Sequence, residues 1–159
     1  MTQDPLRLVP IDRRGVPEDS GLDLGELGKD LCAATASLYE KVGFVPPWLG
    51  YLAVSSGRVV GGCGFTAPPG SGEVEIAYTT FPEFEGRGIA TTMAHRLLTL
   101  ARSSQPHITV IARTLPERNA STHILEKLGF SLRGTLLHAE DGEVWEWEIR
   151  SEPGTRRLA

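Results

Sequence analysis

The spacing of apolar residues along the chain switches between a helical period and a strand period. Apolar residues three and four positions apart predict one helix, or two short ones, over residues 22–42 and single helices over 88–102 and 119–128. Segments with a period of two, or rich in β-branched residues, predict strands between these helices. The predicted strands cover residues 6–9, 51–54, 58–66, 73–80, 107–112, 131–138 and 143–150.

This order of elements predicts a mixed α/β fold. A helix connects the strands over 73–80 and 107–112, so these two should be parallel neighbours, whereas hairpins elsewhere predict antiparallel pairs. Side chains of the 73–80 strand alternate between two faces of the sheet. One face carries Glu73, Glu75, Ala77 and Thr79, and the other carries Val74, Ile76, Tyr78 and Thr80.

Length and composition are typical of one globular domain. The chain has 159 residues, of which 40% are hydrophobic, and this is enough for a substantial core. We interpret residues 1–150 as that single domain and the polar residues 151–159 as a flexible C-terminal tail. The net charge of −4, without a long basic run, argues against a nucleic-acid partner.

Targeting and metal signals are missing from the sequence. No run approaches the ~18 consecutive apolar residues of a membrane span, and residues 1–10 lack the apolar centre of a signal peptide, so we expect a cytoplasmic protein with no membrane partner. Cys32 and Cys63 are too few for a disulfide framework and are expected to be buried thiols. The histidines show no metal-ligand spacing, so no metal is expected. A monomer and a homodimer both remain open.

The segment Glu85-Gly-Arg-Gly-Ile-Ala-Thr91 joins the 73–80 strand to the 88–102 helix. Its small residues allow close approach of backbone N–H groups, and the helix start adds unpaired N–H groups and a positive dipole end. Together with Arg87, this pattern indicates a phosphate or pyrophosphate site, and the structural alternative is a surface loop. There is no Walker loop, and the dinucleotide-like glycines of residues 62–67 are followed by prolines instead of a helix.

Several segments together resemble the GNAT superfamily of acetyl-CoA-dependent N-acetyltransferases, in particular the branch that acetylates N-terminal amines of ribosomal proteins. The resemblance runs from about residue 51 to residue 150, in family order and spacing. Its segments are Glu73-Val-Glu-Ile-Ala-Tyr78, Pro82, Glu85-Gly-Arg-Gly-Ile-Ala90, Asn119-Ala-Ser-Thr and Leu125-Glu-Lys-Leu-Gly-Phe130. It implies a GNAT-like fold, with a mostly antiparallel central sheet, helices on both faces and one splayed parallel pair formed by strands 73–80 and 107–112.

The resemblance also implies an activity, namely direct transfer of an acetyl group from the cosubstrate acetyl-CoA to a primary amine. The acceptor would be a protein N-terminus or a small-molecule amine. Two alternatives stay open. One is a noncatalytic acyl-CoA-binding sensor of the same fold, and the other is an unrelated nucleotide-binding module.

Cofactor-binding residues follow from the same resemblance. Glu85 departs from the family pattern, which has Gln or Arg there, and we expect its carboxylate to point away from the pyrophosphate. Asn119 lies one residue nearer to the following serine than in the family, so either Asn119 or Arg118 could take that place. The implied set is Ala77, Tyr78, Thr79, Glu85, Gly86, Arg87, Gly88, Ile89, Ala90, Thr91, Asn119 and Ser121.

Amine acetylation requires a neutral amine, a polarised carbonyl and a proton donor for the departing thiolate. The resemblance places the general base at Glu75, whose alternative is a solvated strand residue. Leu125 stands where many relatives carry a tyrosine donor, whereas Ser121 matches the serine donor of the ribosomal-protein branch. Ser121 could instead cap its helix. Tyr78 is a third catalytic candidate, with core packing as its alternative.

The acceptor pocket is expected between residues 22–50 and the turn over 138–143, where the resemblance is thinnest. Residues 46–48 could line this pocket or simply cover the sheet. The turn carries Glu140, Asp141 and Glu143, which would attract a cationic amine or merely solvate the turn. A covalent route through a cysteine is disfavoured because no histidine lies near either thiol in the sequence.

Overall fold

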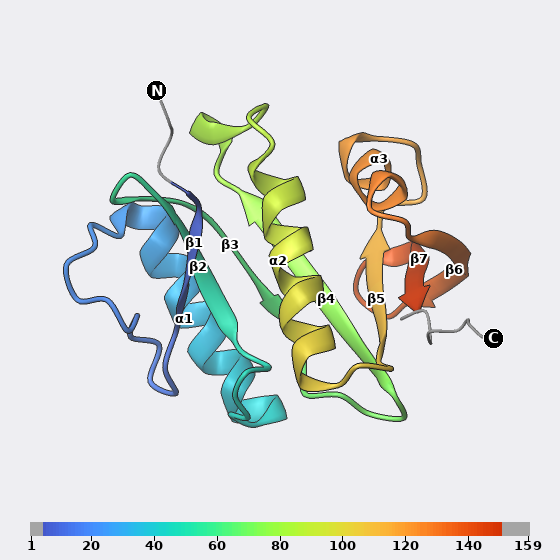
Figure 1. The fold of residues 1–159 in the computed structure, drawn as a ribbon, viewed down its shortest axis with the longest axis horizontal. Helices are drawn as coiled ribbons and strands as arrows, with labels where there is room; N and C mark the ends of the chain where they lie inside the picture. Colours follow the sequence, from blue (N-terminus) through green and yellow to red (C-terminus); the bar gives the residue numbers. More distant parts are fainter. Residues whose placement is uncertain (1–4, 151–159) are drawn as a thin grey trace.

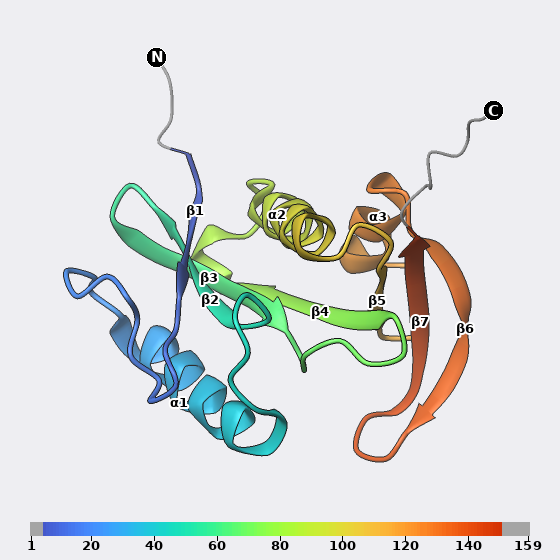
Figure 2. The ribbon, with the colours of Figure 1, turned by 60° about the horizontal axis from the view of Figure 1, so that its bottom comes forward.

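A computed structural model describes residues 5–150, which form a seven-stranded mixed sheet with helices on both faces (Figure 1). Figure 2 shows α1 on one face of the sheet and α2 and α3 on the other. The strands are β1 (Arg7–Pro10), β2 (Gly50–Ser55), β3 (Arg58–Phe65), β4 (Glu73–Thr80), β5 (Thr109–Thr114), β6 (Ser131–His138) and β7 (Gly142–Arg150). The helices are α1 (Gly25–Val42), α2 (Ile89–Ser104), α3 (Ala120–Lys127) and the 3₁₀ turn η1 (Pro82–Phe84).

The strand order is β1-β2-β3-β4-β5-β7-β6, and β4 and β5 form the parallel pair. Their pairing extends over three registers, from Glu73 opposite Thr109 to Glu75 opposite Ile111. Beyond this point the two strands diverge, as Figure 1 shows beneath α2. The predicted fold, with its splayed parallel pair, is therefore confirmed. From Ile76 onward, the edge of β4 that faces β5 has no strand partner within residues 5–150.

Hydrophobic residues of α2 pack on the sheet within the larger of two core clusters. Met93, Leu97 and Ala101 are fully buried at helical spacing against Val74 and Ile76 of β4. Burying a side chain the size of Leu97 contributes about 1.5–3 kcal/mol. A smaller cluster under α1 joins Cys32 to residues of β1, β2 and β3. The sheet is thus anchored on both faces, and its two sides can carry different functions.

Most elements match their expected bounds to within one or two residues, and the largest differences are in β5 and α1. The strand predicted over 107–112 runs from Thr109 to Thr114, because residues 106 and 107 form a turn in which Ile108 N–H donates to the Gln105 carbonyl at 3.1 Å. The segment 22–42 forms one helix that begins at Gly25. The expected tail, residues 151–159, lies outside the described residues. Across residues 5–150, no helix is long and apolar enough to cross a membrane.

Candidate active site

The turn between β4 and α2 contains two glycines in the left-handed region, Gly86 at φ 81° and Gly88 at φ 78°. Gly88 is the N-cap residue of α2, and no side chain of the described residues caps this helix. The first N–H groups of the helix therefore have no side-chain acceptor and remain available to an anion. The glycine turn predicted from the sequence is present, and it presents the positive end of a 16-residue helix.

A cleft of about 510 Å³ lies along this helix start, between the diverging end of β4 and α3. Most of the predicted cofactor residues line it, together with four residues that the sequence analysis missed, Thr80, Phe84, Ala120 and Ile124. Helical spacing could have identified Ile124, because it follows Ser121 by one turn. The predicted residues that line the cleft are Tyr78, Thr79, Glu85, Gly86, Gly88, Ile89, Ala90, Thr91 and Ser121.

Three predicted cofactor residues lie outside this lining. Ala77 lines a different pocket on the opposite face of the sheet. Arg87 is exposed, and its guanidinium carbon lies 5.6 Å from the centre of the Phe84 ring. Asn119 caps α3, because its side-chain oxygen accepts a hydrogen bond from Thr122 N–H at 3.0 Å while the Thr122 hydroxyl accepts from Asn119 N–H at 2.9 Å.

This capping arrangement changes the interpretation of Ser121. The alternative that Ser121 caps α3 is wrong, because Asn119 occupies the N-cap position. Ser121 Oγ instead lies 3.2 Å from the Tyr78 hydroxyl, so the two candidate proton donors form one hydrogen-bonded pair at the cleft. Burial raises the pKa of Tyr78, and the Ser121 hydrogen bond lowers it by less. The phenol therefore remains a proton donor at neutral pH.

Glu75, the candidate base, lies on the other face of β4 within a network of charges. Its Oε1 accepts a hydrogen bond from the Thr66 hydroxyl at 3.2 Å and lies 3.5 Å from Nη1 of Arg113. Arg113 also donates two hydrogen bonds to Glu146 Oε2, at 3.2 and 3.3 Å. Glu75 is therefore a positioned, ion-paired carboxylate and not a freely solvated strand residue.

A second pocket, of about 270 Å³, lies between α1 and the sheet, and we call it the α1 pocket. It shares Tyr78 and Thr79 with the cleft, so the two hollows meet at β4 from opposite faces. Its lining residues are Leu31, Ala34, Thr35, Leu38, Gly50, Tyr51, Gly62, Cys63, Gly64, Phe65, Thr66, Ala77, Tyr78 and Thr79.

The expected acceptor surroundings correspond to this pocket only in part. Residues 31–38 and Gly50 fall within the expected 22–50 segment, but neither residues 46–48 nor the 138–143 turn are among the lining residues. Trp48 is buried and packs edge-to-face on Phe65 with ring centres 5.0 Å apart, so it covers the sheet. The side chains of Glu140, Asp141 and Glu143 are exposed.

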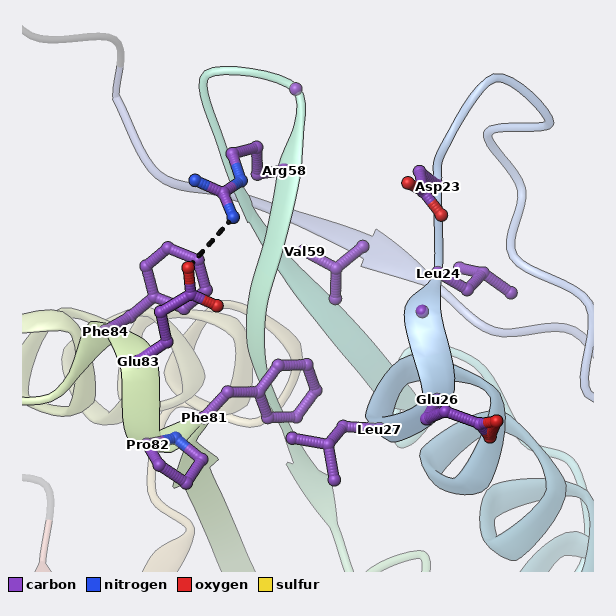
Figure 3. A pocket seen from close by; sticks show the side chains of 12 residues that line it. Asp23, Leu24, Glu26, Leu27, Arg58, Val59, Phe81, Pro82, Glu83 and Phe84 are labelled. Atoms are coloured by element: carbon purple, nitrogen blue, oxygen red, sulfur yellow. Dashed lines mark hydrogen bonds and ion pairs between the residues drawn. The ribbon is translucent and has the colours of Figure 1, made fainter.

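A third hollow, of about 430 Å³, lies at the start of α1 (Figure 3) and contains none of the predicted catalytic or cofactor residues, although residues 23–27 of its lining fall within the segment expected to form the acceptor pocket. In Figure 3 the Phe81 and Leu27 side chains extend toward each other, the first from the residue that follows β4 and the second from α1. At its rim, Arg58 Nη2 lies 3.2 Å from Glu83 Oε2. The Phe84 ring separates this hollow from the cleft, since it lines both.

The cysteines and other metal-ligating residues do not form a reactive centre. Burial raises the pKa of the Cys63 thiol to about 12, and it also raises the pKa of Cys32. Both thiols are therefore protonated at neutral pH and are poor nucleophiles. In the part of the chain that the structure describes, no group of three His, Cys, Asp or Glu residues could hold a metal ion.

Comparison with known proteins identifies the class to which this fold and site belong. A family model described as acetyltransferase (GNAT) domain matches residues 29–131. The match covers more than half of the chain, and the chain belongs to the GNAT acetyltransferase family. No curated protein sequence matches the chain at a significant level.

Similar solved structures support the fold. RimL, a ribosomal L7/L12 alpha-N-protein acetyltransferase, aligns in its apo form with a TM-score of 0.68 and 17% identity, over 93% of this chain and 94% of that chain. The same enzyme in complex with coenzyme A aligns with a TM-score of 0.67 and 16% identity, over 94% and 98%. A GNAT-family acetyltransferase from Bordetella pertussis aligns with a TM-score of 0.65 and 21% identity, over 93% and 97%.

Proposed function

We propose that this protein transfers an acetyl group from acetyl-CoA directly to a primary amine, either a protein N-terminus or a small-molecule amine. The observation that carries the proposal is that the cleft and the α1 pocket meet at Tyr78 and Thr79 from opposite faces of the sheet. A donor in the cleft and an acceptor in the pocket would then touch at one point of β4. Direct transfer needs this contact, because it avoids a covalent enzyme intermediate.

The cleft fits an acyl-CoA in three respects. The left-handed glycines and the uncapped start of α2 present N–H groups to a pyrophosphate. The unpaired edge of β4 beyond Glu75 offers backbone hydrogen bonds to an extended amide chain. Thr80 lines the cleft, and its buried Oγ1 has no hydrogen-bond partner within residues 5–150, so this hydroxyl could bond a ligand there. Acetyl-CoA, when bound, would supply the activated thioester.

Residues of the chain itself would perform the proton transfers. Within residues 5–150, the hydrogen bond and the ion pair of the Glu75 side chain are both made by Oε1, and we assign acceptance of the amine proton to its Oε2, directly or through a water. Tyr78 would donate a proton to the departing thiolate, because a phenol is a stronger acid than a serine hydroxyl. Ser121 then acts as a positioning residue that holds the phenol through their 3.2 Å contact.

The proposed activity is tested by incubating the protein with acetyl-CoA and a panel of amines while following free thiol release and the mass of the product. We expect thiol release that depends on the amine and is accompanied by an N-acetylated product. Binding of CoA, seen by calorimetry, without transfer to any amine would instead favour the acyl-CoA-binding sensor. Preference for ATP or NAD over CoA would contradict both readings.

The assignment of the proton donor predicts different effects for Tyr78→Phe and Ser121→Ala. Loss of the phenol should lower kcat by about 10²-fold, within the usual range for a general acid, whereas loss of Ser121 should lower it by no more than about tenfold. The Ser121 hydrogen bond lowers the pKa of Tyr78, so its removal raises that pKa. Because the donor is lost as pH rises through this pKa, the alkaline limb of the kcat profile should move to higher pH in Ser121→Ala.

Steady-state kinetics across pH checks this prediction, with the acetyl-CoA KM as a control for cleft integrity. A larger loss of kcat in Ser121→Ala than in Tyr78→Phe would exchange the two roles. An alkaline limb that stays in place in Ser121→Ala would show that Tyr78 does not set it.

A further inference from the structure

The α1 pocket has mostly apolar walls. Leu31, Ala34 and Leu38 line it from α1, and Phe65 and Ala77 line it from β3 and β4. Its volume of about 270 Å³ lies just below the roughly 300–1,000 Å³ of pockets that hold whole drug-sized ligands. It therefore suits one compact group of a substrate, such as a branched aliphatic side chain.

The hydroxyl groups of Thr35, Tyr51, Thr66 and Tyr78 in these walls are already bonded within the protein. The Thr35 hydroxyl donates to the Leu31 carbonyl at 2.8 Å, and the Tyr51 hydroxyl donates to the Pro47 carbonyl at 2.6 Å. Cys63 is a buried, protonated thiol that behaves as a small apolar group. A polar substituent in this pocket would lose its water without gaining equivalent hydrogen bonds, which disfavours its binding.

Two glycines in β2 and β3 allow α1 to approach the strands closely at the base of the pocket. A Cβ atom on Gly62 would overlap Leu31 Cδ2, and one on Gly50 would lie 2.7 Å from Thr35 Cγ2. Because these two strand positions lack side chains, α1 packs directly on the backbone of β2 and β3. A side chain at either position would therefore collide with α1, and the residues that α1 places over these glycines contribute to the shape of the pocket.

Charge at the β4 end of the pocket favours a cationic group. Glu75 shares a strand face with Ala77, about 7 Å along the strand, and it accepts a hydrogen bond from Thr66 of the pocket wall. The other carboxylates near Glu75 are ion-paired as well. Arg133 contacts Glu73, Glu146 and Glu148.

The network as a whole holds four carboxylates against three guanidinium groups, a formal charge of −1. Its members are Glu73, Glu75, Glu146, Glu148, Arg113, Arg133 and Arg150. Each guanidinium already contacts a carboxylate, so the network offers little to a negatively charged substrate. A protonated amine, by contrast, would add favourable charge beside Glu75.

We propose that the acceptor is a cationic amine that carries a compact apolar substituent, which enters the α1 pocket while its ammonium group lies beside Glu75. This inference rests on the proposed acetyl transfer and names the class of its acceptor. It assigns the selection of that acceptor to Leu31, Ala34 and Leu38. Acceptors with polar or acidic substituents at the same place are disfavoured.

The test uses four peptides that differ only in their N-terminal residue, which is leucine, glycine, serine or aspartate. With saturating acetyl-CoA, kcat/KM for the leucine peptide should exceed that for the serine peptide by at least about tenfold and that for the aspartate peptide by more. The advantage over aspartate should shrink at high salt, because screening weakens the repulsion by the carboxylates. Equal rates for all four peptides, or a preference for serine or aspartate, would overturn the inference.

Two α1 variants and one matched control localise this preference. Leu38→Asp should lower kcat/KM for the leucine peptide more than about tenfold and leave the acetyl-CoA KM unchanged. Leu27→Asp makes the same change on the same helix, but Leu27 is 49% exposed and lines the third hollow (Figure 3), so it should have no such effect. Ala34→Leu adds carbon atoms at an exposed position of the pocket wall, which should lower the rate with the leucine peptide and spare the glycine peptide.

The Ala34→Leu variant keeps the inference testable if Leu38→Asp does not fold. If both α1 variants discriminate among the four peptides as the unmodified protein does, the α1 pocket does not select the acceptor. A protein that binds CoA but acetylates none of the peptides and no other amine refutes the proposed function, and the acceptor inference falls with it. Transfer without discrimination refutes the acceptor inference alone.

Discussion

Replacing Glu75 with glutamine should lower kcat by between about 10² and 10⁴-fold and leave the affinity for acetyl-CoA unchanged. The amide keeps the shape of the side chain and its contact with Thr66, but it cannot accept the proton of the amine. The cofactor cleft lies on the other face of the sheet and does not include Glu75 among its lining residues. Turnover kinetics and calorimetric titration with acetyl-CoA measure the two quantities separately.

Glu73→Gln is the matched control for this experiment. Glu73 lies two residues earlier on the same strand face and contacts Arg133 of the same ion network, but it lacks the hydrogen bond to Thr66 of the α1 pocket wall that Glu75 has. It should retain kcat within a few-fold of the unmodified protein. Equal losses in both variants would mean that the network as a whole matters, and an unchanged kcat in Glu75→Gln would move the base to another group or to water.

The second large effect is expected at the helix start, where Gly88→Val should weaken CoA binding by about 10³-fold. A β-branched residue at φ 78° costs about 1–3 kcal/mol of backbone strain, so the turn would leave the conformation that presents its N–H groups. Losing one charge-assisted hydrogen bond to a phosphate costs roughly 1.5–3 kcal/mol more. Calorimetric titration with CoA measures the change in Kd.

A control for strain alone is available in the β2–β3 turn. Gly57 has φ 77°, and a Cβ there would meet no atom within 4 Å, as is also true at Gly88. Gly57→Val should therefore lower the melting temperature to a similar extent and leave the Kd for CoA unchanged. If Gly88→Val bound CoA normally while remaining folded, the turn would not be the pyrophosphate site.

Local patterns predicted those parts of the site that depend on neighbours in sequence. The alternation in residues 73–80 gave the bounds of β4 and put Glu75 and Tyr78 on opposite faces, as found. The glycines before α2 likewise signalled a tight, left-handed turn. Strand β5 was displaced by two residues because the turn at 106–107 overrode its β-branched pattern.

Contacts between distant segments could not be predicted in this way. Tyr78 and Ser121 are 43 residues apart, and their pairing depends on how α3 docks beside the splayed strands. The network around Arg113 needs the register of β4, β5 and β7 together. The cap of α3 could have been predicted, because Asn119 and Thr122 have the spacing of a capping box. That spacing would have indicated that Ser121 is not the N-cap residue.

The glycines beneath α1 allow the acceptor pocket to change without a change in the cofactor cleft. Gly50 and Gly62 present backbone to the pocket, and their neighbourhood leaves no room for a larger residue. At these two positions the strands cannot add side chains to the pocket, so α1 is the wall with the most freedom to vary, and α1 takes no part in the cleft, which is lined by β4, α3, the turn before α2 and the first turn of α2. Related proteins can then diverge in acceptor by exchanging a few residues on the exposed helix while the donor side stays the same. The same separation makes α1 the natural target for engineering a new acceptor.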